Sequence, residues 1–385
     1  MSVPGSEAAE ALRRELRAWL EANLEPRFRA VSSALAASAD TIEVLREWNR
    51  KVADAGWAAI SWPAEYGGRD AGVLEQVAWA EEMDRARSPA LVNPIGLSNI
   101  APAILAYGTP AQKDRFLQRM RRGDDIWCQG FSEPDAGSDL ASLRATALQD
   151  GDDFVVNGQK VWNTLGNLAD WCELLVRTDP DAPPHKGISC LLVDMRLPGI
   201  EVRPIVTITG EAEFFEIFFA DVRVPAEALL GPLHQGWRVA MTTLNNERGA
   251  VASLHLAVRR KIRDLIERAR ATPMGGASAA DDPVLRRRLA HVYLEGELLR
   301  RLSDRALSGI VSQRAGPEGA LTKLVWSQTE QHLAEVAAEV AGPEALVGEV
   351  ARARLASRSY SIAGGTTQVN KNVVAQRVLG LPRSY

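Results

Sequence analysis

The sequence has few cysteines and no long hydrophobic run, and both absences narrow the class of protein. Its 385 residues include three cysteines, Cys128, Cys172 and Cys190, an odd number at wide spacing. This pattern predicts reduced thiols in a cytoplasmic protein rather than a disulfide framework. The longest apolar runs are strand-sized, and the N-terminus has early acids and no apolar core. We therefore expect neither a membrane span nor a signal peptide.

Charge and missing motifs argue against further classes. The formal net charge is −4 and no Lys/Arg tract stands out, so nothing indicates nucleic-acid binding. The sequence contains no Gly-x-Gly, Gly-Lys, His-Glu-x-x-His or Cys-x-x-Cys, and its five histidines are scattered. These absences argue against a Rossmann dinucleotide site, a P-loop and a metallohydrolase centre. No nucleophile elbow supports a serine–histidine–aspartate site.

What is present divides the chain into three regions. Residues 1–125 are rich in Ala, Leu, Glu and Arg at helical spacing and predict an N-terminal α-helical domain. Residues 126–236 hold short strand patterns bounded by Gly, Pro and Asp, and predict a middle β-barrel or sandwich. Helical spacing returns at 237–385 and predicts a C-terminal four-helix bundle, with a loop at 274–282. The expected fold class is α+β.

One acid interrupts an apolar stripe on the long helix expected from 237 to 270. Spacings of three and four place one set of residues on a common face, namely Ala240, Leu244, Val251, Leu254, Val258, Ile262 and Leu265. Glu247 falls on the same face. A carboxylate among apolar neighbours is desolvated, which raises its pKa toward neutrality and suits a general base. The alternative is that Glu247 pairs with an arginine of a neighbouring helix.

The C-terminal stretch RSYSIAGGTTQVNKN, residues 358–372, has hydrogen-bonding groups but no acid and no histidine. Gly364 and Gly365 allow the backbone to approach a ligand, and Thr366 and Gln368 can hydrogen-bond it. A helix that begins here would also favour an anionic phosphate near its N-terminus. The alternative is a Gly-Gly helix entry with a threonine cap.

Four motifs follow one another along the chain, namely CQGFSEPDAGSD at 128–139, FVVNGQKVWNTLG at 154–166, IFFADVRVP at 217–225 and IAGGTTQVNKNVVAQRVLGLPR at 362–383. Together they resemble the acyl-CoA dehydrogenase family over nearly the whole chain. They occur in the order in which the family has them. The resemblance implies the family's fold, FAD as the cofactor, and desaturation of a CoA thioester between its α- and β-carbons.

The resemblance also implies roles for individual residues. It implies flavin contacts for Gln129, Phe131, Ser132, Trp162 and Thr164, with Thr164 near N5, and ribityl and adenosine contacts for Thr366 and Gln368. It implies CoA contacts for Ser138, Asn245 and Arg248. The position that often carries the base is Gly364 here, preceded by Ala363 where Tyr is common. LNNERG resembles a branch that includes isovaleryl-CoA dehydrogenase-like members, whose base immediately precedes the Arg. This implies that Glu247 is the base.

Two departures bear on the substrate and the partners. Ala363 and Gly364 leave room for a bulky acyl group, and the motifs look most like actinobacterial members that act on steroid side-chain or other polycyclic acyl-CoAs. The family's Arg–Phe and Gln contacts to a neighbour's FAD are altered, with Glu339 at the Gln position and Gly342 kept. An acid there would repel a pyrophosphate. The resemblance thus implies a heterotetramer with a paralogous subunit, and a homotetramer is the other arrangement.

The family resemblance implies electron-transfer flavoprotein as the electron acceptor. Two other functions fit the same fold. One is an oxidase or flavin monooxygenase that reacts with O₂. The other is a non-catalytic partner subunit that completes an FAD site, and the altered Arg–Phe and Gln positions favour it in part.

Overall fold

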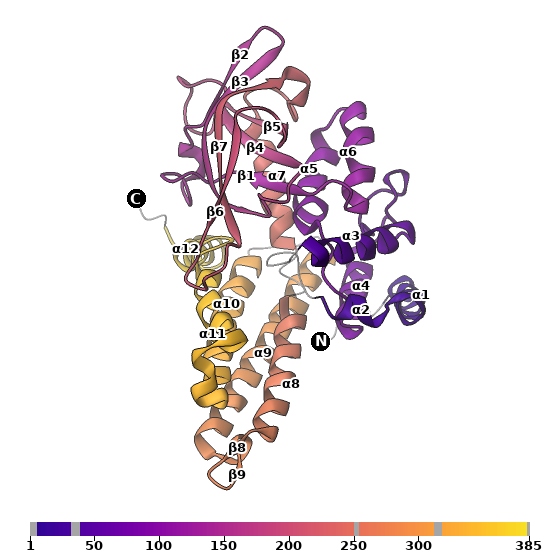
Figure 1. The fold of residues 1–385 in the computed structure, drawn as a ribbon, viewed down its shortest axis with the longest axis vertical. Helices are drawn as coiled ribbons and strands as arrows, with labels where there is room; N and C mark the ends of the chain where they lie inside the picture. Colours follow the sequence, from indigo (N-terminus) through magenta and orange to yellow (C-terminus); the bar gives the residue numbers. More distant parts are fainter. Residues whose placement is uncertain (1–5, 32–38, 250–253, 312–317, 383–385) are drawn as a thin grey trace. The chain divides into compact units, whose positions relative to one another are not determined.

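The computed structural model of the chain describes residues 6–31, 39–249, 254–311 and 318–382, without the side chains of 246–249 and 310 (Figure 1). The fold divides into two compact units. The sheet unit comprises Ala18–Gly72 and Arg87–Glu247. The bundle unit comprises Met1–Arg17, Val73–Ala86 and Arg248–Tyr385.

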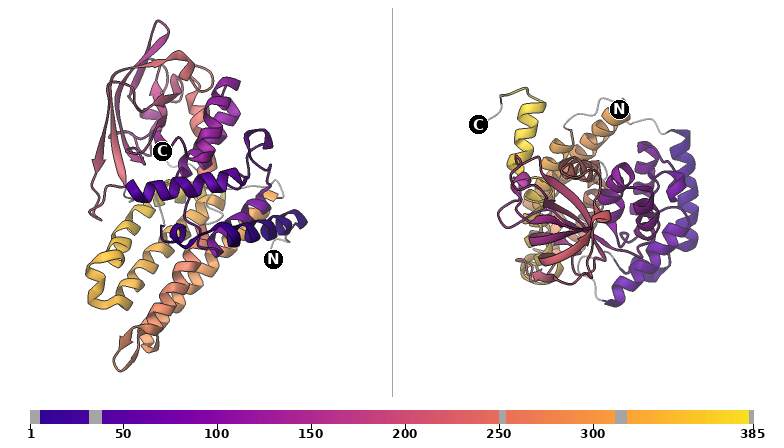
Figure 2. Two further views of the ribbon diagram at one scale, coloured as in Figure 1. Left: turned by 45° about the vertical axis from the view of Figure 1, so that its right-hand side comes forward. Right: turned by 90° about the horizontal axis from the view of Figure 1, so that it is seen from above.

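The sheet unit is built on a mixed seven-stranded sheet of order β1-β4-β2-β3-β7-β6, with β5 paired to β4. The strands are β1 (Trp127–Gly130), β2 (Thr146–Asp150), β3 (Asp153–Thr164), β4 (Trp171–Arg177), β5 (Ile188–Asp194), β6 (Ile200–Ile205) and β7 (Phe214–Pro225). The β1/β4/β5 half joins the rest through the pair Thr146 and Arg177. This narrow junction lets the sheet curl (Figure 2). The expected strands are confirmed, and the barrel or sandwich takes the form of one curled sheet.

The two faces of β4 belong to different cores, because successive strand side chains point to opposite faces. Trp171 and Leu175 pack in a core shared with α5 (Ala101–Tyr107) and α6 (Pro110–Arg122), whereas Cys172 and Leu174 pack in a core that β3 and β7 close. All three cysteines are buried and unpaired, which confirms the expectation of free thiols.

The longer helices of the sheet unit lie before β1 and after β7. The helices of this unit include α2 (Pro26–Arg29), α3 (Ala39–Asp54), η1 (Ala64–Tyr66), η2 (Gly96–Ile100), α5 (Ala101–Tyr107), α6 (Pro110–Arg122), η3 (Leu140–Ser142) and η4 (Ala226–Ala228). α7 (Gly236–Gly249) ends at the boundary between the units. α6 shows why these segments are helical. Thr109 and Gln112 form a capping box, Pro110 opens the helix, and Gly123 ends it at φ 70°.

The bundle unit contains the long C-terminal helices. They are α8 (Leu254–Ala271), α9 (Pro283–Val311), α10 (Glu318–Ala341), α11 (Gly348–Ala356) and α12 (Thr367–Arg377), with η6 (Ala279–Asp281), η7 (Gly342–Leu346) and η8 (Ser357–Ser361). α8, α9 and α10 bury a common apolar core that includes Val258, Leu299 and Leu333. α12 packs on α10. The buried residues Val258, Ile262 and Leu265 confirm the C-terminal part of the predicted stripe.

Two N-terminal helices join the bundle unit, the first part of α1 (Glu7–Asn23) and α4 (Val73–Arg85). Glu82 on α4 is 1% exposed and accepts hydrogen bonds from Arg17 and Arg85. Burial alone would raise the pKa of Glu82, but the two guanidinium groups lower that pKa to about 2. The carboxylate therefore stays charged and fastens α1 to α4.

The segment expected as one helix from 237 to 270 is helical over α7 and α8, and residues 250–253, with Val251 of the stripe, lie outside the described residues. One sequence expectation needs correction. The loop at 274–282 contains a short hairpin of β8 (Pro273–Met274) and β9 (Ala277–Ser278). No helix in the described part of the chain is long and apolar enough to span a membrane.

Candidate functional site

Trp162 combines an exposed ring with an unusual backbone conformation. It lies in β3 where the pairing with β7 shifts between Lys160 and Asn163, at a β-bulge. Its φ is 62°, which is uncommon for a residue other than glycine, and it is 58% exposed. The indole packs edge-on against Phe214, with the ring centroids 5.9 Å apart. Such an exposed aromatic, held in a sparsely populated conformation, suits stacking against a planar ligand.

The segment after β1 lies directly beside this bulge. Val161 N donates to Ser132 O at 2.9 Å, and Lys160 Nζ donates to Phe131 O at 3.2 Å. The structure therefore brings Phe131, Ser132 and Trp162 together. The Phe131 ring is buried in the core, so its main chain is the part beside the bulge. Thr164 pairs with Phe214 at the end of β3.

A buried ion pair that the sequence analysis missed fixes this segment. Lys160 is fully buried, and its Nζ lies 2.7 Å from Glu133 Oε1. Glu133 also accepts from Arg144 N at 2.7 Å and Ala145 N at 2.9 Å. Burial lowers the pKa of Lys160, and the adjacent Glu133 carboxylate opposes that shift. The sequence did offer a signal for this pair, because the motif CQGFSEPDAGSD contains the glutamate and the motif FVVNGQKVWNTLG contains the lysine.

A second buried acid, Glu173 on β4, also escaped the sequence analysis. Glu173 is 0% exposed and lies opposite Gln129 in the β1–β4 register. Its Oε1 accepts from Thr243 Oγ1 at 2.7 Å and from Cys190 Sγ at 3.9 Å. Glu173 Oε2 and Gln129 Nε2 are both buried, and the Gln129 amide lies close enough to the carboxyl to lower its pKa. Desolvation raises the pKa of Glu173 to about 8, so the carboxyl is mainly protonated at pH 7.

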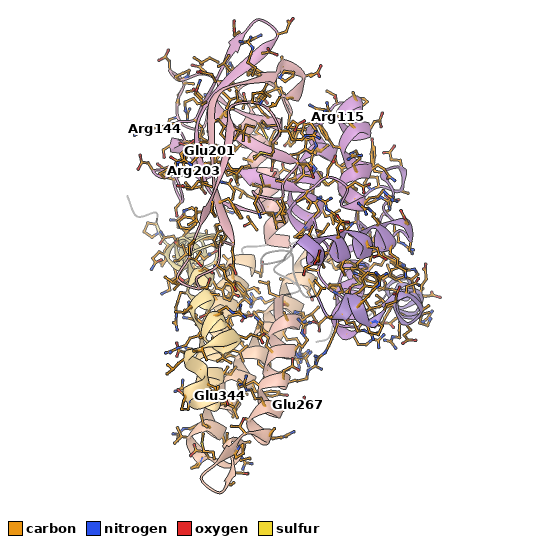
Figure 3. The ribbon with its side chains drawn as sticks, viewed as in Figure 1. Arg115, Arg144, Glu201, Arg203, Glu267 and Glu344 are labelled. Carbon is orange, nitrogen blue, oxygen red and sulfur yellow. The ribbon has the colours of Figure 1, made fainter. Side chains whose placement is uncertain are left out.

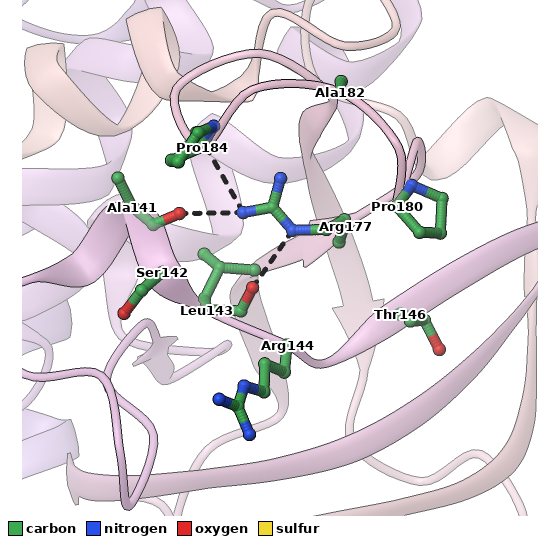
Figure 4. A pocket seen from close by; sticks show the side chains of 9 residues that line it. All are labelled: Ala141, Ser142, Leu143, Arg144, Thr146, Arg177, Pro180, Ala182 and Pro184. Atoms are coloured by element: carbon green, nitrogen blue, oxygen red, sulfur yellow. Dashed lines mark hydrogen bonds between the residues drawn. The ribbon is translucent and has the colours of Figure 1, made fainter.

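A pocket of about 390 Å³ opens on the sheet unit shortly after Ser138. It is lined by Ala141, Ser142, Leu143, Arg144, Thr146, Arg177, Pro180, Ala182 and Pro184. The Arg177 guanidinium forms part of its wall because it donates to the carbonyls of Ala141, Leu143 and Pro184 (Figure 4). The Arg144 side chain is exposed and points away from Arg177 (Figure 4). Ser138 is exposed in the preceding loop.

The proposed base and two CoA-contact candidates fall at the end of α7. Asn245 is exposed on this helix. Glu247 and Arg248 are within α7, but their side chains lie outside the described residues. Earlier on the helix, Ala240 is buried and Leu244 is half-buried, as the stripe predicts.

The C-terminal stretch forms a capped helix entry in the bundle unit. Gly364 and Gly365 have φ of 63° and 88°, and Thr366 caps α12 by accepting from Val369 N at 3.1 Å. A hydroxyl that accepts one hydrogen bond can still donate its own hydrogen. Gln368 is exposed on the first turn, and Ala363 and Gly364 are exposed before it. The threonine cap is therefore present, and it leaves Thr366 able to donate to a ligand.

Lys323 on α10 supports this entry and was not predicted. It is 8% exposed, and its Nζ donates to Tyr360 O and, at 3.3 Å, to Gly365 O. Asn370 Nδ2 donates to the same Gly365 carbonyl at 2.8 Å. The two donors fix the position of the Gly-Gly turn. On the same helix Glu339 forms an ion pair with Arg288, which offsets its negative charge.

Comparison with known proteins places the chain in a family. Models of the acyl-CoA dehydrogenase N-terminal, middle and C-terminal domains match residues 6–124, 128–222 and 234–379. Acyl-CoA dehydrogenase IpdE1 of Mycobacterium tuberculosis is 40% identical over 97% of this chain and 98% of its own length. The chain belongs to the acyl-CoA dehydrogenase family. Membership makes it an oxidoreductase of acyl-CoA thioesters, with the three-domain architecture expected from the sequence.

Two solved structures of complexes are similar over the whole length of the chain. The Tcur3481–Tcur3483 steroid ACAD has a TM-score of 0.86 at 30% identity, with 100% of both chains covered. The ChsE4–ChsE5 complex from Mycobacterium tuberculosis has a TM-score of 0.85 at 32% identity, again with 100% of both chains covered. Each of these relatives is an assembly of two differently named subunits.

Proposed function

We propose that this acyl-CoA dehydrogenase desaturates the CoA thioester of a bulky, branched or steroid-derived acid, with FAD as its cofactor. The observation that carries the proposal is the exposed Trp162 ring, held at φ 62° beside the Phe131–Ser132 segment. Electron-transfer flavoprotein is the proposed electron acceptor.

The described residues fit a flavin. Trp162 offers an exposed ring face and Thr164 a partly exposed hydroxyl, and Gln129 on β1 is a further proposed contact. Ser132 and the Phe131 main chain lie beside them. In the bundle unit, Thr366 and Gln368 at the start of α12 are the proposed ribityl and adenosine contacts. Bound FAD would supply N5 as the acceptor of the hydride that leaves the substrate β-carbon.

Glu247 is the proposed general base. Desaturation requires removal of the α-proton of the thioester, and a carboxylate can accept it. The last motif offers no acid, because Ala363 and Gly364 occupy the positions where a Tyr and the base are common. Glu247 continues the face of α7 on which Ala240 is buried. Ser138, Asn245 and Arg248 are the proposed CoA contacts, and the pocket beside Ser138 lies in the same loop region.

The acyl group and the assembly are inferred together. Small residues at 363 and 364 leave space for a wide acyl group, and the Tcur3481–Tcur3483 relative is named as a steroid enzyme. Both structural relatives are two-subunit complexes, which supports a heterotetramer with a paralogous chain. The Arg288–Glu339 pair weakens the argument from charge repulsion, so the altered Arg–Phe contact is the stronger reason to expect a partner.

The test measures the ratio of FAD to protein for the chain alone and for the chain co-expressed with paralogous acyl-CoA dehydrogenases of its genome. FAD is expected only in the co-expressed complex. A steroid side-chain acyl-CoA is then added, and flavin bleaching is followed for the native complex and for Glu247→Gln. The substitution should lower the bleaching rate by about 10²- to 10⁴-fold without loss of FAD, because general-base catalysis contributes on that order.

The matched control is Glu267→Gln, the same change at an exposed acid on α8 (Figure 3). It should bleach at the native rate. A homotetramer with one FAD per chain would overturn the heteromer. A Glu247→Gln complex that bleaches at the native rate would remove the base assignment and favour a non-catalytic subunit. Oxygen consumption during turnover without electron-transfer flavoprotein would favour an oxidase.

A further inference from the structure

Three side chains of the bundle unit form a cluster outside the proposed flavin site. His291 and Glu295 lie on α9 at i and i+4, a spacing that puts them on one face of the helix. His332 reaches them from α10. The three offer ligand atoms that all lie within 4.8 Å of one another. We call these residues the His–Glu–His cluster.

Distances within the cluster are close to those of metal ligands. Glu295 Oε1 lies 2.8 Å from His332 Nδ1 and 3.3 Å from His291 Nε2. A tetrahedral ion with bonds of about 2.0–2.1 Å separates its ligand atoms by about 3.3 Å. The histidine rings are exposed, with side chains 66% and 52% accessible, so small rotations can adjust them. The three groups need little rearrangement to share one ion.

One carboxylate oxygen of Glu295 lacks a hydrogen-bond donor among the described residues. Its side chain is 18% exposed, and its Oε2 is buried without a hydrogen-bond partner in the described part of the chain. A buried carboxylate oxygen without a partner is costly, and an ion bound at the other oxygen, Oε1, would offset the charge of the carboxylate.

We propose that the His–Glu–His cluster binds a first-row divalent metal ion, with Zn²⁺ as the best fit. Two imidazoles and one carboxylate are typical zinc ligands, and imidazole donors disfavour Mg²⁺ and Ca²⁺. The fourth position faces solvent and takes water. The ion would join α9 to α10, the helix that also carries Lys323 and so holds the Gly-Gly turn. Its role is structural, since the cluster contains no part of the proposed reaction.

Zinc titration of the metal-stripped full-length chain tests the proposal, with calorimetry for stoichiometry and thermal unfolding for stability. One Zn²⁺ per chain is expected, with a rise in the unfolding temperature because the ion binds the folded state. Co²⁺ should show the visible absorption bands of a tetrahedral site. Glu295→Gln and His332→Gln should each weaken zinc binding at least tenfold.

His185→Gln is the matched control, since it removes an exposed histidine of the sheet unit. It should bind zinc as the native chain does. The metal-free variants should unfold near the native temperature, which separates loss of a ligand from loss of the fold. Native zinc affinity in Glu295→Gln, or an equal loss in His185→Gln, would overturn the site. So would the absence of stoichiometric binding, which would leave the cluster as an ordinary hydrogen-bonded group.

Discussion

Two regions of the sheet unit each bury a glutamate, and the groups that surround the two carboxyls differ. Glu133, 8% exposed, meets the ammonium of Lys160 and two backbone N–H groups. Glu173, 0% exposed, accepts from the Thr243 hydroxyl and the Cys190 thiol, and the Gln129 amide lies beside it. The first region supports a charged carboxylate, and the second supports a protonated one. Burial alone therefore does not determine the charge of an acid, and its immediate donors decide it.

The difference has a structural consequence near the proposed flavin site. The Lys160–Glu133 ion pair positions the Phe131 segment, because Lys160 Nζ also donates to the Phe131 carbonyl beside the Trp162 bulge. The Glu173 carboxyl instead connects β4 to α7 through the Thr243 hydroxyl. The ion pair thus fixes the loop beside the proposed ring contact, and the neutral acid fixes the helix that carries Glu247.

The largest expected effect comes from removing the cation. Lys160→Met leaves Glu133 buried and unpaired, and we expect a loss of about 3–5 kcal/mol in the free energy of unfolding. FAD retention should also fall, because the Phe131 segment loses its anchor. Chemical denaturation and the FAD-to-protein ratio of the purified complex measure the two effects.

Lys186→Met is the control for Lys160→Met, since Lys186 is exposed in the same unit. It should leave both quantities near native. Combining Lys160→Met with Glu133→Gln should recover part of the loss, because no unpaired charge then remains. If the double variant is as unstable as the sum of the single changes, the comparison between the two regions is wrong.

Much of the fold was predictable because its signals are local. The Asp282–Pro283 pair is a local signal for the start of α9, and Asp282 Oδ1 accepts from Val284 N and Leu285 N as a cap does. The hairpin at β8–β9 was missed because strands of two residues have no alternation to detect. Its Gly275–Gly276 turn, with φ of 59° and 87°, was the usable signal.

The candidate site was less predictable, because its contacts join distant parts of the sequence. Lys160 and Glu133 are 27 residues apart, and Glu173 and Thr243 are 70 apart. β4 is buried on both faces from Trp171 to Val176, so no alternation marks Glu173 as an inward acid. The motif residues Ser132 and Trp162 came from the family resemblance, and single-residue patterns would have left them as a turn and a core side chain.

An effect that depends on pH is expected at Glu173. Its pKa is about 8 in the fold against 4.5 for the free side chain, so between these values the folded chain holds a proton that the unfolded chain lacks. This contribution to stability is complete below pH 4.5 and falls by about 1.4 kcal/mol per pH unit as the pH rises toward 8. Glu173→Gln has no group that titrates at this position, so the variant should not show this fall in stability. Its stability relative to the native chain should therefore rise from pH 4.5 to pH 8.

Unfolding experiments at several pH values between 4.5 and 8 measure that gain as a difference between the two proteins. Glu227→Gln, the same change at an exposed acid of the sheet unit, should show no such pH-dependent difference. A constant offset between native protein and Glu173→Gln would mean that Glu173 titrates normally. The contrast with Glu133 would then disappear.

The smallest expected effect comes from the Thr243 hydroxyl, which donates to Glu173. Thr243→Val keeps the side-chain shape and removes the hydroxyl that donates to Oε1, at a cost of about 1 kcal/mol. Because this hydrogen bond lowers the pKa of Glu173, its loss should raise that pKa further and extend the fall in stability to higher pH. Thr242→Val, the same change one residue earlier, removes a hydroxyl that contacts Tyr107 and should leave the pH profile unchanged. If the fall in stability of Thr243→Val ends at the same pH as in the native protein, desolvation alone sets the protonation of Glu173. The donors to Glu173 then matter less than those to Glu133.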